Sequence, residues 1–176
     1  MEDYVILVNE EDEEVGVREK LQAHLDGALH RAFSVFLFND EGDLLLQQRQ
    51  PDKYHSGGLW SNTCCSHPRP GELVEAAAHR RLQEEMGVTC ALQRLFGFVY
   101  HSKLEHDLYE HEYDHVFVGR YNGVPVPNRA EVASWRWVQA DALRKDIAAR
   151  PDRYTYWFRL VLDRVLEERV AGGEEL

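Results

Sequence analysis

The stretch NTCCSHPRPGELVEAAAHRRLQEEMGV, residues 62–88, decides the fold of this chain. Positions 73–86 have the apolar spacing of a helix, and Gly87 suits the left-handed position just past a helix end. Glu84 and Glu85 stand in the last turn of that helix. Mg²⁺ prefers oxygen ligands and often joins a protein to phosphate groups, so the frame predicts a metal-assisted phosphate site. A Glu-Glu pair alone is more often solvated surface.

The composition bounds the class of protein. The chain has 176 residues, of which 44% are hydrophobic and 29% charged, which is typical of a globular protein and predicts one domain over residues 1–176. No apolar run could span a bilayer and no signal peptide is visible, so we expect a cytoplasmic protein without a membrane partner. A net charge of −11 argues against nucleic acid as a partner. Three cysteines, two of them adjacent, favour a reducing compartment.

Short strand and helix patterns alternate irregularly along the chain. Apolar, β-branched patterns predict strands at residues 4–8, 32–38, 44–48, 95–101, 113–121 and 134–138. Helical spacing predicts helices at residues 18–25, 73–86, 140–149 and 154–169. The Asn-Asp-Glu-Gly sequence at 39–42 predicts a hairpin turn, and residues 50–61 are expected to form a loop over the sheet. This order indicates an α/β sandwich with a mixed central sheet.

Three histidines and two glutamates form a candidate metal site. His24, His30 and His67 each lie near the edge of a predicted element, whereas Glu110 and Glu112 are two residues apart, so that on a strand both face the same side. Five such ligands exceed the four that Zn²⁺ prefers and favour Mn²⁺ or Mg²⁺, with Zn²⁺ still compatible. Nine histidines in an acidic chain can equally be scattered surface residues.

Several other residues have two possible roles. Cys65 can be a nucleophile, a metal ligand or a proton donor, whereas Cys64 suits an inert buried position. Trp157 lies on the apolar face of a helix and either belongs to the core or presents its ring to a cation. Tyr100 is either a strand residue or a hydrogen-bond partner of a catalytic carboxylate. The residues alone leave these alternatives open.

A phosphate site in so acidic a chain must depend on local cations and metal ions rather than on the overall charge. Arginine and lysine side chains are the usual partners of phosphate oxygens. The candidates are Lys20, Arg49, Lys53 and Arg81. Taken singly, each is an ordinary surface charge.

The frame around the glutamate pair resembles the Nudix box, with two departures. Glu72, Arg80 and Gly87 stand at the spacing of the box, but Ser66 occupies the position where the box begins with Gly. Arg81 occupies a position where the box has Glu. The missing carboxylate suggests a chain that holds a diphosphate without hydrolysing it.

Beyond the box, the chain resembles the type I isopentenyl-diphosphate delta-isomerases from residue 5 to about residue 165. The matching segments are HRAFSVFLFN at 30–39, NTCCSHP at 62–68, RRLQEEMG at 80–87 and EHE at 110–112. The combination is much more specific than the Nudix box alone. It implies a Nudix-like α/β/α sandwich and the interconversion of isopentenyl diphosphate and dimethylallyl diphosphate by a 1,3-allylic proton shift, a step of isoprenoid biosynthesis.

The resemblance also implies a role for each candidate residue. Cys65 and Glu112 match the proton-transfer pair, Tyr100 the partner of the glutamate, and Trp157 the residue that stabilises the carbocation. The divalent metal site, for Mn²⁺ or Zn²⁺, matches His24, His30, His67, Glu110 and Glu112. Glu85 matches the carboxylate associated with Mg²⁺ and the diphosphate. The diphosphate contacts match Lys20, Arg49, Lys53, Ser66 and Arg81.

Two other functions, a hydrolase and a catalytically silent module, are alternatives to the isomerase. A Nudix hydrolase acting on a nucleoside diphosphate derivative needs a carboxylate at position 81, where Arg81 has the wrong charge. A catalytically silent metal-binding module needs no reactive thiol. We therefore expect a monomeric enzyme whose partner is a small diphosphate.

Overall fold

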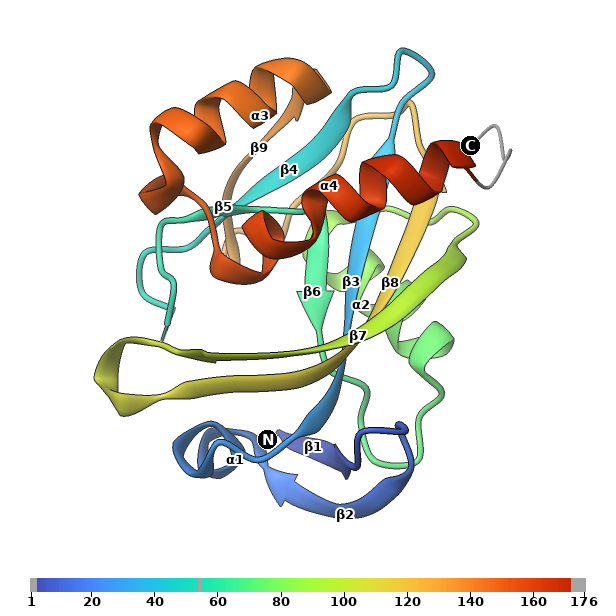
Figure 1. Cartoon of the computed structure of the whole chain (residues 1–176). Coiled ribbons are helices and arrows are strands. Elements are labelled where there is room, and N and C mark those ends of the chain that lie inside the picture. Colours follow the sequence, from blue (N-terminus) through green and yellow to red (C-terminus); the bar gives the residue numbers. More distant parts are fainter. Residues whose placement is uncertain (1–2, 54, 172–176) are drawn as a thin grey trace.

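The computed structural model describes residues 3–53 and 55–171 and has the predicted layered architecture. Helix α4 (Tyr156–Ala171) crosses one face of a mixed sheet, and helix α2 (Val74–Met86) lies behind the other (Figure 1). The predicted α/β/α sandwich is therefore confirmed. Among the described residues, no helix combines the length and the apolar character that crossing a bilayer requires.

Strand β3 (His30–Phe38) is the centre of the sheet. It runs parallel to β8 (Tyr109–Arg120), with partners from His30 opposite Glu112 to Phe38 opposite Arg120. Its other edge pairs with β6 (Cys64–Ser66) and makes short contacts with two further strands. Those strands are β1 (Tyr4–Val8) and β4 (Leu44–Arg49). The remaining strands are β2 (Glu14–Glu19) beside β1, β7 (Gln93–Lys103) beside β8, and β5 (Trp60–Ser61) and β9 (Val132–Val138) beside β4.

Strand β3 is apolar nearly throughout because both of its faces are covered. Alternate residues point to opposite faces, so Phe33, Val35 and Leu37 belong to the core cluster that contains the buried side of α2. Phe36 and Phe38 belong to the cluster beneath α4. The second cluster also contains residues of α3 (Ala140–Ala149), which has the predicted bounds.

Helix α2 ends where the sequence predicts. Gly87 has a φ of 65°, and its N–H donates to the carbonyl of Gln83 at 3.0 Å. A Cβ at this position would lie 2.6 Å from the carbonyl oxygen of Val126. Gly87 is thus required both by its left-handed backbone and by this close approach.

One local prediction is wrong, and another is confirmed with a shorter pairing than a full hairpin would have. Residues 18–19 belong to β2 rather than to the predicted helix at 18–25, and α1 (Lys20–Asp26) begins only after Glu19 caps the N–H groups of Leu21 and Gln22. The predicted hairpin around 39–42 does turn there, but β3 and β4 pair only at Phe38 and Leu44, because β8 and β6 occupy the edges of β3. Two short 3₁₀ turns complete the chain, at Glu105–Asp107 and Pro151–Arg153.

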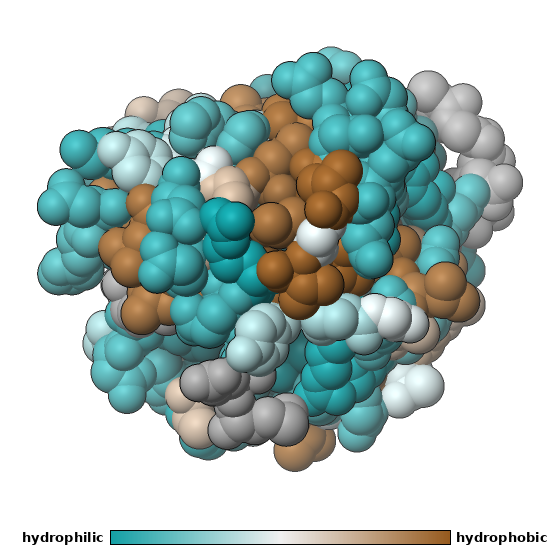
Figure 2. Space-filling model, turned by 90° about the horizontal axis from the view of Figure 1, so that it is seen from below, coloured by the Kyte–Doolittle hydropathy of each residue, from teal (hydrophilic) through white to brown (hydrophobic). Residues whose placement is uncertain are grey.

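The end of the molecule that carries β1, β2 and α1 exposes several apolar side chains. Figure 2 shows brown side chains gathered in the middle of a mainly hydrophilic face, seen from that end. Exposed apolar residues on these elements include Val15, Val17, Leu21 and Leu25.

Candidate active site

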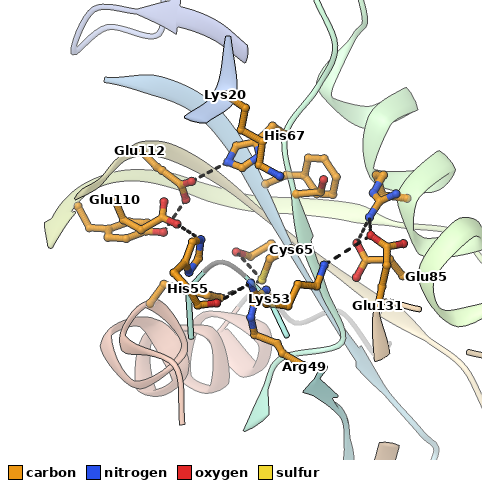
Figure 3. Close-up of a pocket in the computed structure, with 16 residues that line it drawn as sticks. Lys20, Arg49, Lys53, His55, Cys65, His67, Glu85, Glu110, Glu112 and Glu131 are labelled. Carbon is orange, nitrogen blue, oxygen red and sulfur yellow. Dashed lines mark hydrogen bonds and ion pairs between the residues drawn. The ribbon is translucent and has the colours of Figure 1, made fainter. Parts of the chain in front are cut away.

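The predicted site residues meet at one pocket. All of them line it except His24 and His30, which lie beside it in a histidine and glutamate cluster. In Figure 3, Glu110 and Glu112 lie on one side of the pocket and Glu85 and Glu131 on the other. The metal ligands thus lie at one end of the pocket, and two of the candidate phosphate contacts, Lys53 and Arg81, lie with Glu85 and Glu131 at the other.

The register of four neighbouring strands builds the site. Glu112 on β8 is paired with Tyr100 on β7 and with His30 on β3. Four residues further along β3, Ser34 is paired with Cys65 on β6. Because paired residues project to the same face of a sheet, the two proton-transfer candidates share one pocket although they are far apart in sequence.

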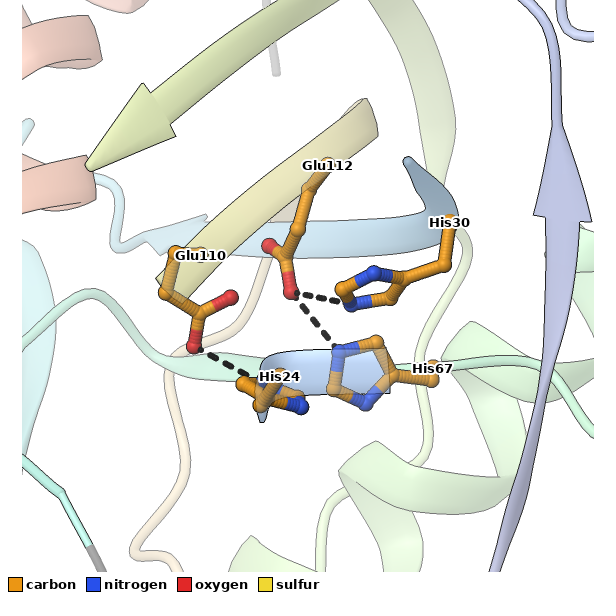
Figure 4. Close-up of side chains that lie close together, drawn as sticks. All are labelled: His24, His30, His67, Glu110 and Glu112. Atoms are coloured by element: carbon orange, nitrogen blue, oxygen red, sulfur yellow. Dashed lines mark hydrogen bonds and ion pairs between the residues drawn. The ribbon is translucent and has the colours of Figure 1, made fainter. Parts of the chain in front are cut away.

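The five predicted metal ligands lie close together at one end of the pocket. One ligand atom from each of them lies within 4.8 Å of the others (Figure 4). Four of the five side chains are buried, although histidine and glutamate side chains are polar or charged. Burying so many polar groups is costly unless they pair with each other or bind an ion.

Backbone carbonyls determine which histidine nitrogens face the carboxylates. Nδ1 of His24 lies 2.8 Å from the carbonyl oxygen of Lys20, and Nδ1 of His30 lies 2.9 Å from that of Ala28. A carbonyl can only accept, so each Nδ1 carries the hydrogen and a neutral ring presents the lone pair of Nε2. These lone pairs are directed into the cluster, which is the arrangement of metal ligands.

The described residues do not provide a donor for every carboxylate oxygen of this cluster. Nε2 of His24 lies 3.3 Å from Oε1 of Glu110, and Nε2 of His30 lies 3.1 Å from Oε2 of Glu112. Two acceptors at such distances repel each other unless a proton or a cation lies between them. In addition, the buried Oε2 of Glu110 has no hydrogen-bond partner among the described residues. The donor set therefore fits a divalent cation.

The ionisation of His67 and Glu112 suits metal binding. Burial lowers the pKa of His67 to about 4, against the opposing effect of Glu112, so the ring is neutral at physiological pH. Burial alone would raise the pKa of Glu112, but the contacts with His30 and His67 outweigh it and hold that pKa well below its usual value. Neutral imidazoles and an ionised carboxylate are the forms that bind metals.

Cys65 is enclosed by polar partners. Its sulfur accepts a hydrogen bond from the indole N–H of Trp157 at 3.0 Å, and its S–H donates to Oδ1 of Asn62 at 3.0 Å. The hydroxyl of Ser34 lies 3.6 Å away. Burial and the carboxyl group of Asp114 raise the pKa of Cys65 to about 12, so the thiol is protonated at neutral pH.

Glu112 is the polar group opposite the thiol. The hydroxyl of Tyr100 donates to its Oε1, while its Oε2 faces His30 and His67. Burial and the neighbouring Glu112 raise the pKa of Tyr100 well above its usual value, so the phenol keeps the proton that it donates. Glu112 thus belongs both to the metal cluster and to the wall of the pocket.

The opposite end of the pocket carries cations. Nη2 of Arg81 lies 2.8 Å from Oε2 of Glu85 and 2.7 Å from Oε1 of Glu131. Nζ of Lys53 lies 3.6 Å from the same oxygen of Glu131. Gln47 also holds Glu85, at 3.0 Å. The Nε atoms of Arg81 and Arg49 are buried and have no hydrogen-bond partner among the described residues.

Glu84 lies outside this arrangement. It pairs with Arg80 at 2.9 Å and with Arg81 at 3.1 Å, and it does not line the pocket. Of the two adjacent glutamates expected at the phosphate site, only Glu85 lines the pocket. Arg80 is held by Glu72 as well, so this part of the frame stabilises the N-terminal approach to the helix.

Sequence reasoning missed four residues at the site. His55, Glu131 and Ser34 line the pocket, and Asn62 bonds to Cys65. Asn62 lies within the quoted NTCCSHP segment and could have been suspected from its position. Ser34 likewise lies within the quoted HRAFSVFLFN segment. His55 and Glu131 have no local pattern, because only the paths of two loops bring them here.

The architecture and this site define a Nudix protein. The NUDIX domain family matches residues 28–158. The structure resembles that of DR0079 from Deinococcus radiodurans, with a TM-score of 0.75 and 25% identity, covering 92% of this chain and 98% of that one. It also resembles a MutT protein from Methanosarcina mazei, with a TM-score of 0.66 and 17% identity over 80% of this chain and 95% of that one. The predicted fold is confirmed.

Relatives of similar length narrow the class further. The chain is 55% identical to isopentenyl-diphosphate Delta-isomerase 1 of Aromatoleum aromaticum, covering 94% of both chains. It is 51% identical to isopentenyl-diphosphate Delta-isomerase of Burkholderia multivorans over 93% of both, and 49% identical to isopentenyl-diphosphate Delta-isomerase 2 of Photorhabdus laumondii over 100% of this chain and 99% of that one. The chain therefore belongs to the isopentenyl-diphosphate Delta-isomerase family of Nudix-domain proteins.

Proposed function

We propose that this protein interconverts isopentenyl diphosphate and dimethylallyl diphosphate in isoprenoid biosynthesis. One terminal carbon of the alkene gains a proton, a carbocation forms, and the carbon next to the diphosphate-bearing end of the chain loses a proton. Two proton-transfer groups are needed because the two carbons exchange protons in opposite directions. Cys65 and Glu112 on the walls of one pocket are the observation that carries this proposal.

The two groups differ in ways that suit the reaction. Cys65 is a protonated thiol whose sulfur accepts a hydrogen bond from Trp157, so negative charge left on the sulfur is stabilised. Glu112 accepts a hydrogen bond from the hydroxyl of Tyr100, and this hydroxyl can stay hydrogen-bonded to Glu112 when the carboxyl group gains or loses a proton. The group that donates a proton in one direction of the interconversion accepts it in the other.

Trp157 is well placed to stabilise the carbocation. It lines the pocket next to Cys65 and is itself 4% exposed, so water is kept from its ring. A cation over a desolvated indole ring gains about 2 kcal/mol, which corresponds to roughly a thirtyfold change in rate. The exclusion of water matters as much, because water would trap a tertiary cation.

The cationic end of the pocket fits the diphosphate. Lys53 and Arg81 lie at this end, and Lys20, Arg49 and Ser66 line the same pocket and offer further donors to phosphate oxygens. Glu85 would hold Mg²⁺ beside them. At the other end, His24, His30, His67, Glu110 and Glu112 would hold Mn²⁺ or Zn²⁺, which when bound supplies positive charge that tunes the acidity of Glu112.

The rival hydrolase is disfavoured by the surroundings of Arg81. A hydrolase of this fold needs a further carboxylate at that position, but here a guanidinium joins Glu85 to Glu131. Its positive charge opposes a cluster of metal ions at this point and favours retention of the diphosphate.

We also propose that the chain works as one monomeric domain in the cytoplasm. The three cysteines are free thiols, which suits a reducing compartment. Every residue named for the reaction comes from this one chain. Sedimentation analysis of the purified protein tests the monomer directly.

The decisive experiment is an activity assay with isopentenyl diphosphate, Mg²⁺ and Mn²⁺. Wild-type protein should form dimethylallyl diphosphate without releasing phosphate, and Cys65→Ala should lose at least about a hundredfold in kcat. Asp163→Ala, at an exposed position on α4, is a matched control and should keep full activity. Phosphate release without allylic product would support the hydrolase, and full activity in Cys65→Ala would reject the role of the thiol.

A further inference from the structure

His55 contacts the metal cluster although it does not belong to the predicted ligand set. Its Nε2 lies 3.0 Å from Oε1 of Glu110, and its side chain is 5% exposed. The ring stacks on that of His24 with centroids 5.7 Å apart, and it meets the ring of Trp157 edge-on at 6.0 Å. His55 therefore lies between the metal cluster and the residue proposed to face the carbocation.

The hydrogen bonds of His55 distinguish it from the metal ligands. Its Nδ1 lies 3.2 Å from the hydroxyl of Ser56, which can donate to it. Nε2 then carries the hydrogen and donates to Oε1 of Glu110. In His24 the opposite nitrogen carries the hydrogen, because Nδ1 faces a backbone carbonyl. The two rings thus approach the same carboxylate in different tautomers.

This hydrogen bond explains why the two carboxylate oxygens of Glu110 differ. Its Oε1 is engaged by His55, whereas its buried Oε2 has no hydrogen-bond partner among the described residues. A carboxylate held by a donor on one oxygen leaves the other oxygen oriented for a metal ion. The loop that carries His55 is itself held in place, because the N–H of Ser56 donates to Glu105 and Arg49 donates to the carbonyl of His55.

We propose that His55 is a positioning residue of the metal centre. Its Nε2–H holds Oε1 of Glu110, so that Oε2 would be left for a bound ion, and the edge of its ring contacts Trp157 on the side of the pocket proposed to hold the hydrocarbon. The proposal rests on the metal site of the proposed function, but it concerns ion binding and can be tested without turnover.

The test compares Mn²⁺ affinities, measured from the electron paramagnetic resonance signal of free Mn²⁺. Loss of such a supporting partner typically weakens metal binding about 10- to 100-fold, which is the expectation for His55→Ala. His55→Gln should stay within about threefold of wild type, because its amide can still donate to Glu110. His79→Ala, at an exposed position on α2, is the matched control and should bind Mn²⁺ as wild type does.

Unchanged Mn²⁺ affinity in His55→Ala would overturn the proposal, as would a wild-type protein that binds no divalent ion. Equal losses in His55→Ala and His55→Gln would overturn it in favour of direct ligation by the imidazole. If His55→Ala fails to fold, nitrogen-15 NMR of the Zn²⁺-loaded wild type decides: an Nε2–H tautomer supports the proposal and an Nδ1–H tautomer rejects it. Weakened Mn²⁺ binding in a protein without isomerase activity would reject the proposed function and leave the role of His55 intact.

Discussion

The indole N–H of Trp157 donates to the sulfur of Cys65, with 3.0 Å between Nε1 and Sγ. This contact joins the residue proposed to stabilise the carbocation to the residue proposed to transfer the proton. The two functions are therefore not independent, and a change at Trp157 alters both the ring that faces the substrate and the environment of the thiol.

Two substitutions separate these effects. Trp157→Phe keeps an aromatic face but removes the N–H, and it should lower kcat up to about tenfold, the value of one hydrogen bond. Trp157→Leu removes the ring as well and should lower kcat by about a further thirtyfold. Steady-state rates at saturating substrate give both numbers. Equal rates for the two variants would remove the ring from the mechanism.

The thiol of Cys65 should react unusually slowly with alkylating reagents. Burial and Asp114 raise its pKa to about 12, so at pH 8 only about one molecule in ten thousand carries the reactive thiolate. The rate of modification by iodoacetamide should rise about tenfold per pH unit between pH 7 and 10, measured at Cys65 by mass spectrometry. The unfolded chain is the control, and a plateau near pH 9 would contradict the raised pKa.

Arg81 should act on substrate binding and on stability together. Arg81→Gln removes a charge from the diphosphate end, so KM should rise at least about tenfold with a smaller change in kcat. It also removes the guanidinium shared by Glu85 and Glu131, leaving them only Gln47 and Lys53 as partners, which should cost about 1–3 kcal/mol, less than a fully buried pair because Arg81 and Glu131 are partly exposed. The double variant with Glu131→Gln should recover part of the stability in thermal unfolding but not the KM.

Removing the divalent ion should lower the melting temperature. The cluster of five ligands is strained by facing acceptors when no cation lies among them, so a chelator should destabilise the protein and Mn²⁺ or Zn²⁺ should restore it. An ion at a hundred times its Kd adds about 2.7 kcal/mol, or about 5–10 °C for a chain of this size. His30→Ala should abolish the response, and identical melting curves with and without the chelator would argue against a metal site.

Much of the fold follows from local pattern. Helix α2 was predictable because its apolar spacing and Gly87 agree, and β3 because a strand covered on both faces is apolar throughout. Strand β6 was missed because three residues have no periodicity to detect. The start of α1 was misplaced because Val15 and Val17 alternate as in a strand, a pattern that the charged residues around them obscure.

The residues of the site also fall into those that the sequence predicts and those that it does not. Cys65, His67 and Glu112 were predictable because they lie in segments that resemble a known family. Such segments say nothing about residues outside them. His55 and Glu131 reach the pocket from loops, and no property of those loops in sequence points toward a carboxylate or an arginine in another part of the chain.

The parallel pairing of β3 and β8 places His30 opposite Glu112, and it also limits how this protein can vary. A single residue inserted into either strand would turn the side chains on one side of the insertion to the other face, so that Arg31 or His111 would take the place of a ligand in the cluster. Changes in length among natural variants should therefore concentrate outside these two strands, and the two strands should keep their length even where their apolar residues are exchanged.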